Sequence, residues 1–79
     1  MQREPVDSSL LASAGYLPGR ALLEVEFRSR EVYQYFDVPQ HTHQELMAAE
    51  SKGRYYHARI RNRFRYQKVY PQSSAQAAV

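Results

Sequence analysis

The sequence contains no cysteine, and its 79 residues include only three glycines. The absence of cysteine excludes a disulfide framework, thiol catalysis and cysteine-ligated zinc. No apolar run approaches the ~20 residues of a membrane span, and no charged-then-apolar signal segment opens the chain. A chain this short forms one domain and buries only about 60% of its unfolded surface, which leaves little room for a pocket. We therefore expect a cytoplasmic, non-enzymatic protein without a cofactor or a membrane partner.

Acidic residues are absent from the C-terminal part of the chain. Residues 51–79 carry a charge of +7 with no Asp or Glu, whereas residues 1–50 carry −4. Six of the seven C-terminal cations lie between Lys52 and Arg65, a stretch that we call the basic segment. A block of one sign is typical of polyanion binding, most commonly nucleic acid and next an anionic membrane surface. Alternatively, the block neutralises acids of the same domain. The candidate partners would then be Glu24, Glu26, Glu31 and Glu45.

Two segments before residue 30 have the pattern of β-strands. From Ser9 to Tyr16, small and apolar residues alternate loosely, which indicates a weak strand. Residues 17–20, Leu-Pro-Gly-Arg, indicate a tight turn because proline fixes φ and glycine tolerates positive φ. From Ala21 to Arg28 the alternation is clear and has period two. One face of this second strand is apolar and consists of Leu23, Val25 and Phe27.

A third strand is expected over residues 31–37, and the length of the hairpin loop before it decides which face turns inward. A two-residue loop would bury the amide of Gln34 opposite Val25. A three-residue loop instead sets Tyr33 opposite Val25, and it places Arg30 near the left-handed conformation that glycine usually takes. We favour the three-residue loop, because tyrosine rings fill a small core while keeping a hydroxyl at its rim.

Two helices are expected after Val38-Pro39, where proline ends the sheet. The first runs from about His41 to Glu50. The second is capped by Ser51, and its apolar residues recur at i, i+4 and i+8 as one buried stripe. The residues of that stripe are Tyr56, Ile60 and Phe64. Beyond Asn62 the pattern is ambiguous, because Phe64, Tyr66 and Tyr70 also fit an extended segment.

The predicted fold class is therefore α+β. It consists of a three-stranded antiparallel β-meander followed by two short helices packed on one face. Residues 8–70 form the single domain, preceded by an N-terminal arm over residues 1–7. The Ser/Ala/Gln-rich residues 71–79 are predicted to be a disordered tail.

The basic segment and two tyrosines near it are the candidate binding residues. Arginine binds phosphate oxygens in pairs through its planar fork, and aromatic faces stack on bases for ~1–3 kcal/mol each. Tyr55 and Tyr66 lie off the buried stripe beside arginines, although both could instead pack on the sheet. The predicted nucleic-acid-binding residues are Lys52, Arg54, Tyr55, Arg59, Arg61, Arg63, Arg65 and Tyr66.

Histidines and carboxylates do not add a catalytic or metal site. His41 and His43 diverge by ~200° if both lie on the helix, so they cannot share one ion there. No serine, histidine and carboxylate have the spacing of a nucleophilic triad. We predict no catalytic residue and no metal ligand.

The order of short motifs along residues 5–70 resembles the KTSC domain. The matching pieces are Val6-x-Ser8-Ser9, Gly15-Tyr16, Leu23-x-Val25-x-Phe27, Val32-Tyr33-x-Tyr35, Val38-Pro39, Ala49-x-Ser51-x-Gly53-x-Tyr55-Tyr56 and Ile60-Arg61. This family takes its name from the C-terminus of some lysyl-tRNA synthetases, and it also occurs as a small stand-alone bacterial protein. The resemblance implies RNA binding by association with the synthetase.

Two functional hypotheses follow. The first is a nucleic-acid-binding module, for RNA rather than DNA, that contacts mainly phosphates with little base specificity. The second is a protein-interaction module that docks an acidic partner, or a second copy of itself, through the same surface or an open sheet edge. The aromatic residues interleaved with the cations favour the first, because stacking requires them and charge docking does not.

Overall fold

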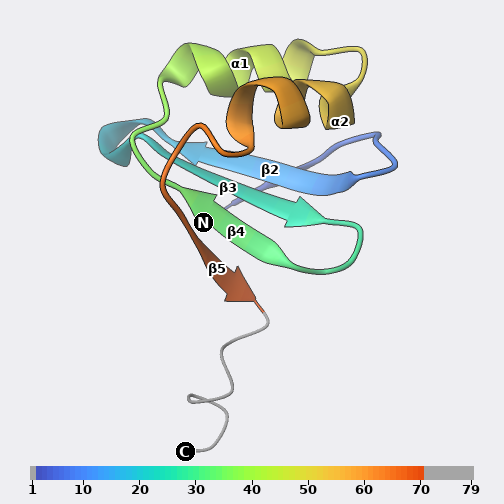
Figure 1. Cartoon of the computed structure of the whole chain (residues 1–79), viewed down its shortest axis with the longest axis horizontal. Coiled ribbons are helices and arrows are strands. Elements are labelled where there is room, and N and C mark those ends of the chain that lie inside the picture. Colours follow the sequence, from blue (N-terminus) through green and yellow to red (C-terminus); the bar gives the residue numbers. More distant parts are fainter. Residues whose placement is uncertain (1, 71–79) are drawn as a thin grey trace, which may run out of the picture.

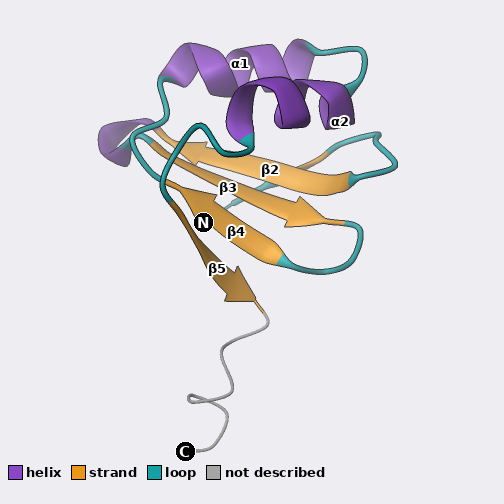
Figure 2. Cartoon of the chain, in the orientation of Figure 1, coloured by secondary structure: helices purple, strands orange, loops and turns teal. Residues whose placement is uncertain are grey.

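The computed structural model describes residues 2–70, and the predicted tail lies outside this range. A five-stranded antiparallel sheet has its strands in chain order, and the helices cover one of its faces (Figures 1 and 2). The strands are β1 (Glu4–Pro5), β2 (Leu11–Leu17), β3 (Leu22–Phe27), β4 (Val32–Tyr35) and β5 (Tyr66–Tyr70). The helices are α1 (Gln40–Ala48) and α2 (Lys52–Tyr55), with a 3₁₀ turn η1 (Pro18–Arg20) and a π-helical turn η2 (Tyr56–Ile60).

The α+β class is confirmed, but the prediction of three strands is wrong. The first additional strand, β1, belongs to the predicted N-terminal arm and pairs with β2. The second, β5, pairs with β4 in the stretch beyond Asn62 where the pattern also fits an extended segment. The predicted second helix ends at Ile60, because Arg61 turns to extended backbone (ψ 128°) and Asn62 takes a left-handed φ of 63°. Phe64 therefore lies outside the helix and packs against the core from the following loop.

The register of the β3–β4 hairpin is the predicted one. Tyr33 lies opposite Val25, and Tyr35 lies opposite Leu23. The backbone N–H of Arg30 donates to the Phe27 carbonyl at 2.9 Å, and Arg30 has a φ of 80°. The three-residue loop therefore turns both tyrosines toward the helices.

The core lies between the sheet and the helices. Its completely buried residues come from both layers and are Leu11, Leu23, Val25, Val38, Leu46 and Ile60. Leu46 anchors α1, and Ile60 with Tyr56 anchors α2 and η2. The position of the basic segment is therefore fixed by two buried side chains within it.

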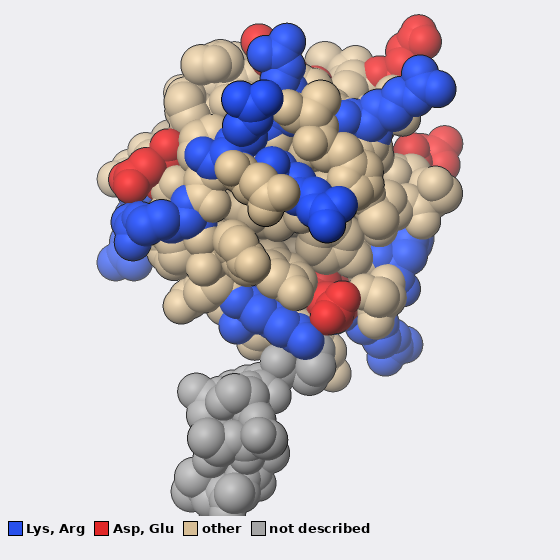
Figure 3. Space-filling view, in the orientation of Figure 1, with Lys and Arg blue, Asp and Glu red and all other residues tan. Residues whose placement is uncertain are grey.

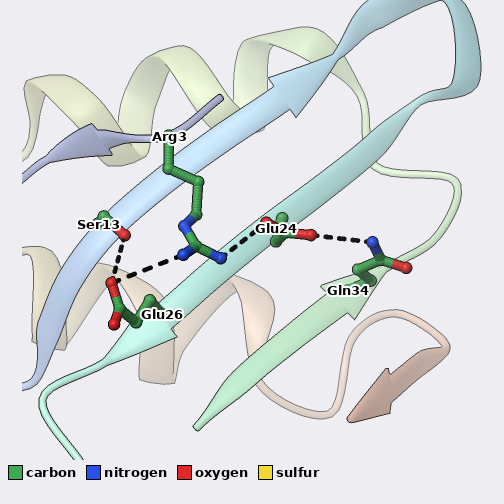
Figure 4. A network of polar contacts seen from close by, with 5 residues as sticks. All are labelled: Arg3, Ser13, Glu24, Glu26 and Gln34. Atoms are coloured by element: carbon green, nitrogen blue, oxygen red, sulfur yellow. Dashed lines mark hydrogen bonds and ion pairs between the residues drawn. The ribbon is translucent and has the colours of Figure 1, made fainter. Parts of the chain in front are cut away.

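The opposite face of the sheet carries a polar network that joins the N-terminus to the strands (Figure 4). Arg3 contacts Glu24 at 2.7 Å and Glu26 at 3.8 Å. Gln34 donates to Glu24 at 2.9 Å, and Ser13 donates to Glu26 at 2.8 Å. The carboxylate of Glu24 is thus buried with two partners, as burial of a charge requires.

Candidate nucleic-acid interface

The basic segment runs through α2, η2 and the loop that leads into β5. The hydroxyl of Ser51 caps α2 by accepting from the Arg54 backbone N–H at 3.3 Å, as predicted. Because Tyr56 and Ile60 point into the core, the cations between and around them point to solvent. The exposed ones are Arg54, Arg59, Arg61, Arg63 and Arg65, while Lys52 is half-buried and donates to the Ala49 carbonyl at 2.9 Å. The face shown in Figure 3 carries many more Lys and Arg side chains than Asp and Glu.

The acids that were candidate partners of the basic segment have other partners. Arg3 forms ion pairs with Glu24 and Glu26, and Lys68 of β5 forms one with Glu31 at 3.0 Å. Glu45 accepts a hydrogen bond from a tyrosine hydroxyl instead of an ion pair.

Within residues 2–70, the basic segment makes one ion pair, between Arg65 and Asp37 at 3.3 Å. The side chains of Arg65 and Asp37 are 77% and 81% exposed, so this ion pair contributes little to the stability of the fold. The remaining arginines of the segment keep their charge available to an external anion. They are Arg54, Arg59, Arg61 and Arg63.

The two candidate stacking tyrosines lie in different surroundings. Tyr55 packs against the core, and its hydroxyl donates to Glu45 at 2.6 Å. Burial, followed by that hydrogen bond, raises the pKa of Tyr55 to about 12. Tyr66 on β5 is 57% exposed, and its ring lies 5.6 Å from that of Tyr33 and 5.7 Å from that of Tyr35. Tyr66 is therefore the tyrosine whose ring is open to a ligand.

The ring of Tyr66 forms one wall of a surface hollow of about 530 Å³, which we call the aromatic hollow. It lies on the helix side of the sheet, between η2 and the strands. Its aromatic lining consists of Phe27, Tyr33, Tyr35, Tyr56 and Tyr66. Its polar lining consists of Ser9, Arg28, Ser29, Glu31, Arg61 and Asn62, and Leu10 completes it.

Of the predicted site residues, only Arg61 and Tyr66 line the aromatic hollow. The sequence pattern assigns Phe27 and Tyr33 to the inner face of the sheet, which is correct, but the helices leave both rings only partly buried. Arg28 was missed because it precedes the basic segment by many positions. The interleaving of aromatic and basic residues near the β3–β4 loop is the one signal in the sequence that could have indicated this site.

Two tyrosines in the lining of the hollow are joined through their buried hydroxyls. The hydroxyl oxygens of Tyr35 and Tyr56 are 2.6 Å apart. Burial raises the pKa of both phenols, so both remain protonated at neutral pH. Only one of the two protons can lie in the bond that joins them, and the other has no acceptor within residues 2–70.

These features define a small α+β domain with a basic, tyrosine-rich surface on its helical side. Residues 7–64 match the family model of the KTSC domain, and the chain belongs to this family. A crystal structure of a KTSC domain protein from Yersinia pestis superposes with a TM-score of 0.84 and 44% identity, covering 86% of this chain and 96% of that one. The expected family resemblance is thus confirmed.

Two relatives show the contexts in which similar sequences occur. A protein from Tsukamurella paurometabola is 39% identical over 62 residues, which are 78% of this chain and 92% of that protein. A lysine–tRNA ligase from Nostoc sp. is 36% identical over 63 residues, or 80% of this chain. The matched segment makes up only 11% of the ligase.

Residues 2–70 contain neither a membrane-spanning helix nor a cluster of metal ligands. No helix in residues 2–70 has the length and apolar character needed to cross a membrane. No group of three or more His, Asp or Glu side chains in that range is arranged to hold a metal ion.

Proposed function

We propose that this KTSC domain is a non-enzymatic nucleic-acid-binding module that binds RNA rather than DNA through the basic segment. The observation that carries the proposal is the set of exposed arginines without a carboxylate partner in residues 2–70. Arg3 pairs with Glu24 and Glu26, and Lys68 pairs with Glu31, so the cations that meet these acids lie outside the segment. The positive potential of the segment is therefore left for an external polyanion.

The chemistry of these side chains suits phosphate. Each guanidinium offers a planar pair of donors to phosphate oxygens, and each contact releases counterions from the nucleic acid. Tyr66, which is exposed beside Arg61 in the hollow, adds a ring on which a base can stack. The choice of RNA is supported by the lysine–tRNA ligases, whose name gives a tRNA as substrate and which contain a similar segment.

A salt titration tests the proposal. Binding of a fluorescein-labelled single-stranded RNA is followed by fluorescence anisotropy at several salt concentrations. Four phosphate contacts give a slope of log affinity against log salt of roughly −3. The variant Arg59→Gln/Arg63→Gln removes two cations that do not line the hollow, so the slope is expected to become shallower by about 1.4.

The matched control is Arg20→Glu, which lowers the net charge by the same two units from a position in η1. The slope of this control is expected to stay at the wild-type value. Absence of RNA binding at low salt contradicts the proposal. So does an equally shallower salt slope in Arg59→Gln/Arg63→Gln and in Arg20→Glu. Circular dichroism of each variant verifies that the fold is intact.

A second candidate function, self-association, is favoured by the edge of the sheet. Within the described residues β5 pairs with β4 alone, so one of its sides is open. Tyr66 and Tyr70 are exposed on this strand at 57% and 52%. Open strands of this kind pair with other strands. Sedimentation velocity over a range of protein concentrations, without nucleic acid, shows a concentration-dependent shift if the edge pairs with a second copy.

A further inference from the structure

The aromatic hollow has the volume of a small-ligand site. Its volume of about 530 Å³ falls in the range of roughly 300–1,000 Å³ that such pockets occupy. The rings around it come from separate elements: Phe27 from β3, Tyr33 from β4, Tyr56 from η2 and Tyr66 from β5. Of these rings, that of Tyr66 is the exposed one on which a planar ligand can stack.

Most of the lining is held in place before any ligand arrives. The ring of Phe27 contacts Tyr33 and Tyr56 edge-on, with centroids 5.6 Å and 5.3 Å apart. The hydroxyl contact between Tyr35 and Tyr56 fixes a fourth ring. Tyr66 is the exposed member, with one side against Tyr33 and Tyr35. The hollow is therefore a preformed recess with one accessible aromatic wall.

The charge at the rim suits an anionic ligand. Arg61 lines the hollow directly after buried Ile60, and its guanidinium lies 3.5 Å from Nδ1 of His57. Arg28 also lines the hollow, held by the carbonyl oxygens of residues 6 and 8. The one acid in the lining, Glu31, is paired with Lys68. The combined rim is positive.

We infer that the aromatic hollow binds one unstacked base of a single-stranded RNA, with an adjacent phosphate on Arg61, an inference that rests on the proposed function. The base stacks on Tyr66, whose ring is the exposed one among those that line the hollow. A base inside a duplex is stacked on its neighbours and cannot enter. The domain therefore prefers single strands and reads a base as well as the backbone.

The test separates the base from the phosphates. Affinity is measured for a labelled single-stranded RNA and for a strand of the same length and charge made of abasic residues. The base-containing strand is expected to bind about 5- to 150-fold more tightly, the range that corresponds to one stacked base. Annealing the RNA to its complement is expected to remove this advantage.

Variants of β5 assign the effect to the hollow. Tyr66→Leu keeps an apolar side chain on the strand but removes the aromatic face. This variant is expected to bind the base-containing strand and the abasic strand with equal affinity. Tyr66→Phe keeps the ring and the preference. The matched control is Tyr70→Leu, which removes an equally exposed tyrosine of the same strand that lines a different surface, near Arg3 and Val32.

Each outcome decides between the two proposals. Equal affinity of wild-type protein for both strands, with a steep salt dependence retained, overturns the base-binding site and leaves the proposed function standing. An equal effect of Tyr66→Leu and Tyr70→Leu also overturns it. Absence of binding to either strand overturns the proposed function itself.

Discussion

Replacement of Gly15 by alanine tests how the N-terminus is joined to the sheet. Gly15 lies in β2, where a methyl group would overlap the backbone carbonyl oxygen of Gln2 and press on the Arg3 backbone. In a strand without such a neighbour, Gly→Ala stabilises the fold by about 0.5–1 kcal/mol. Here the backbone of residues 2–3 must move, and the 2.7 Å contact between Arg3 and Glu24 is lost.

The energy of that contact decides whether Gly15→Ala raises or lowers the free energy of unfolding. A hydrogen bond to a charged group contributes about 1.5–3 kcal/mol to stability. The lower half of this range applies to the Arg3–Glu24 contact, because the Arg3 side chain is 27% exposed to solvent. Subtracting the gain from alanine leaves a destabilisation of about 1 kcal/mol, with an upper value near 2. Urea unfolding followed by circular dichroism is expected to show a midpoint lowered by about 0.5–1 M.

A double-mutant cycle identifies the mechanism. Arg3→Met removes the ion pair directly, so in that background Gly15→Ala has no ion pair left to break and is expected to be neutral or to stabilise by up to about 1 kcal/mol. Contacting sites of this kind show coupling energies of about 0.5–3 kcal/mol. Additive effects of the two substitutions, or a stabilising Gly15→Ala in the wild-type background, would refute the reasoning.

Two further predictions concern a turn and a tyrosine. Arg30→Gly is expected to raise the free energy of unfolding by up to about 1 kcal/mol in a urea titration, because Arg30 has a φ of 80°; an unchanged or lower value contradicts this. The raised pKa of Tyr55 means that the fold favours its neutral form, so the stability due to this group is complete below pH 10 and is lost as pH rises toward about 12. Phenolate absorbance of the wild type minus that of Tyr55→Phe measures this pKa, and Glu45→Gln should lower it.

The β3–β4 hairpin could be predicted from the sequence because two local rules agree on it. The period-two pattern of residues 21–28 defines one inner face, and burial of an amide disfavours the shorter loop. The structure has that register and the left-handed Arg30 that comes with it. The alternation of apolar residues and the length of the loop were sufficient to predict the register of this hairpin.

The two outer strands could not be predicted in this way. β1 has only two residues, one of them Pro5, so it shows no periodicity. Its position depends on the space that Gly15 leaves and on the ion pair of Arg3, both of which involve distant parts of the chain. β5 is mostly exposed, and its pattern also fits the end of a helix until the left-handed Asn62 breaks the helix off.

The candidate site was predicted in part for a similar reason. Exposure of the arginines follows from the spacing of Tyr56 and Ile60, which local pattern shows. The aromatic hollow depends on where η2 ends, since Arg61 and Asn62, which follow that end, belong to its lining. That end lies at the extended backbone of Arg61 and the left-handed Asn62, which the spacing of apolar residues does not show.

The position of Tyr66 on β5 links occupancy of the hollow to the opening of the sheet. The contact between Gln67 and Gln34 spans 33 positions, so β5 must close a long loop to pair, whereas β4 pairs with β3 across a short hairpin. An exposed edge strand of this kind exchanges its amide hydrogens through local opening, ahead of the central strands. A ligand that needs the ring of Tyr66 binds only the closed sheet, and so it slows amide exchange in β5 in proportion to its concentration over its dissociation constant. The slower amides of β2 and β3 exchange through larger openings that also destroy the site, so the ligand slows them by the same factor, and β5 shows the slowing at the shortest exchange times.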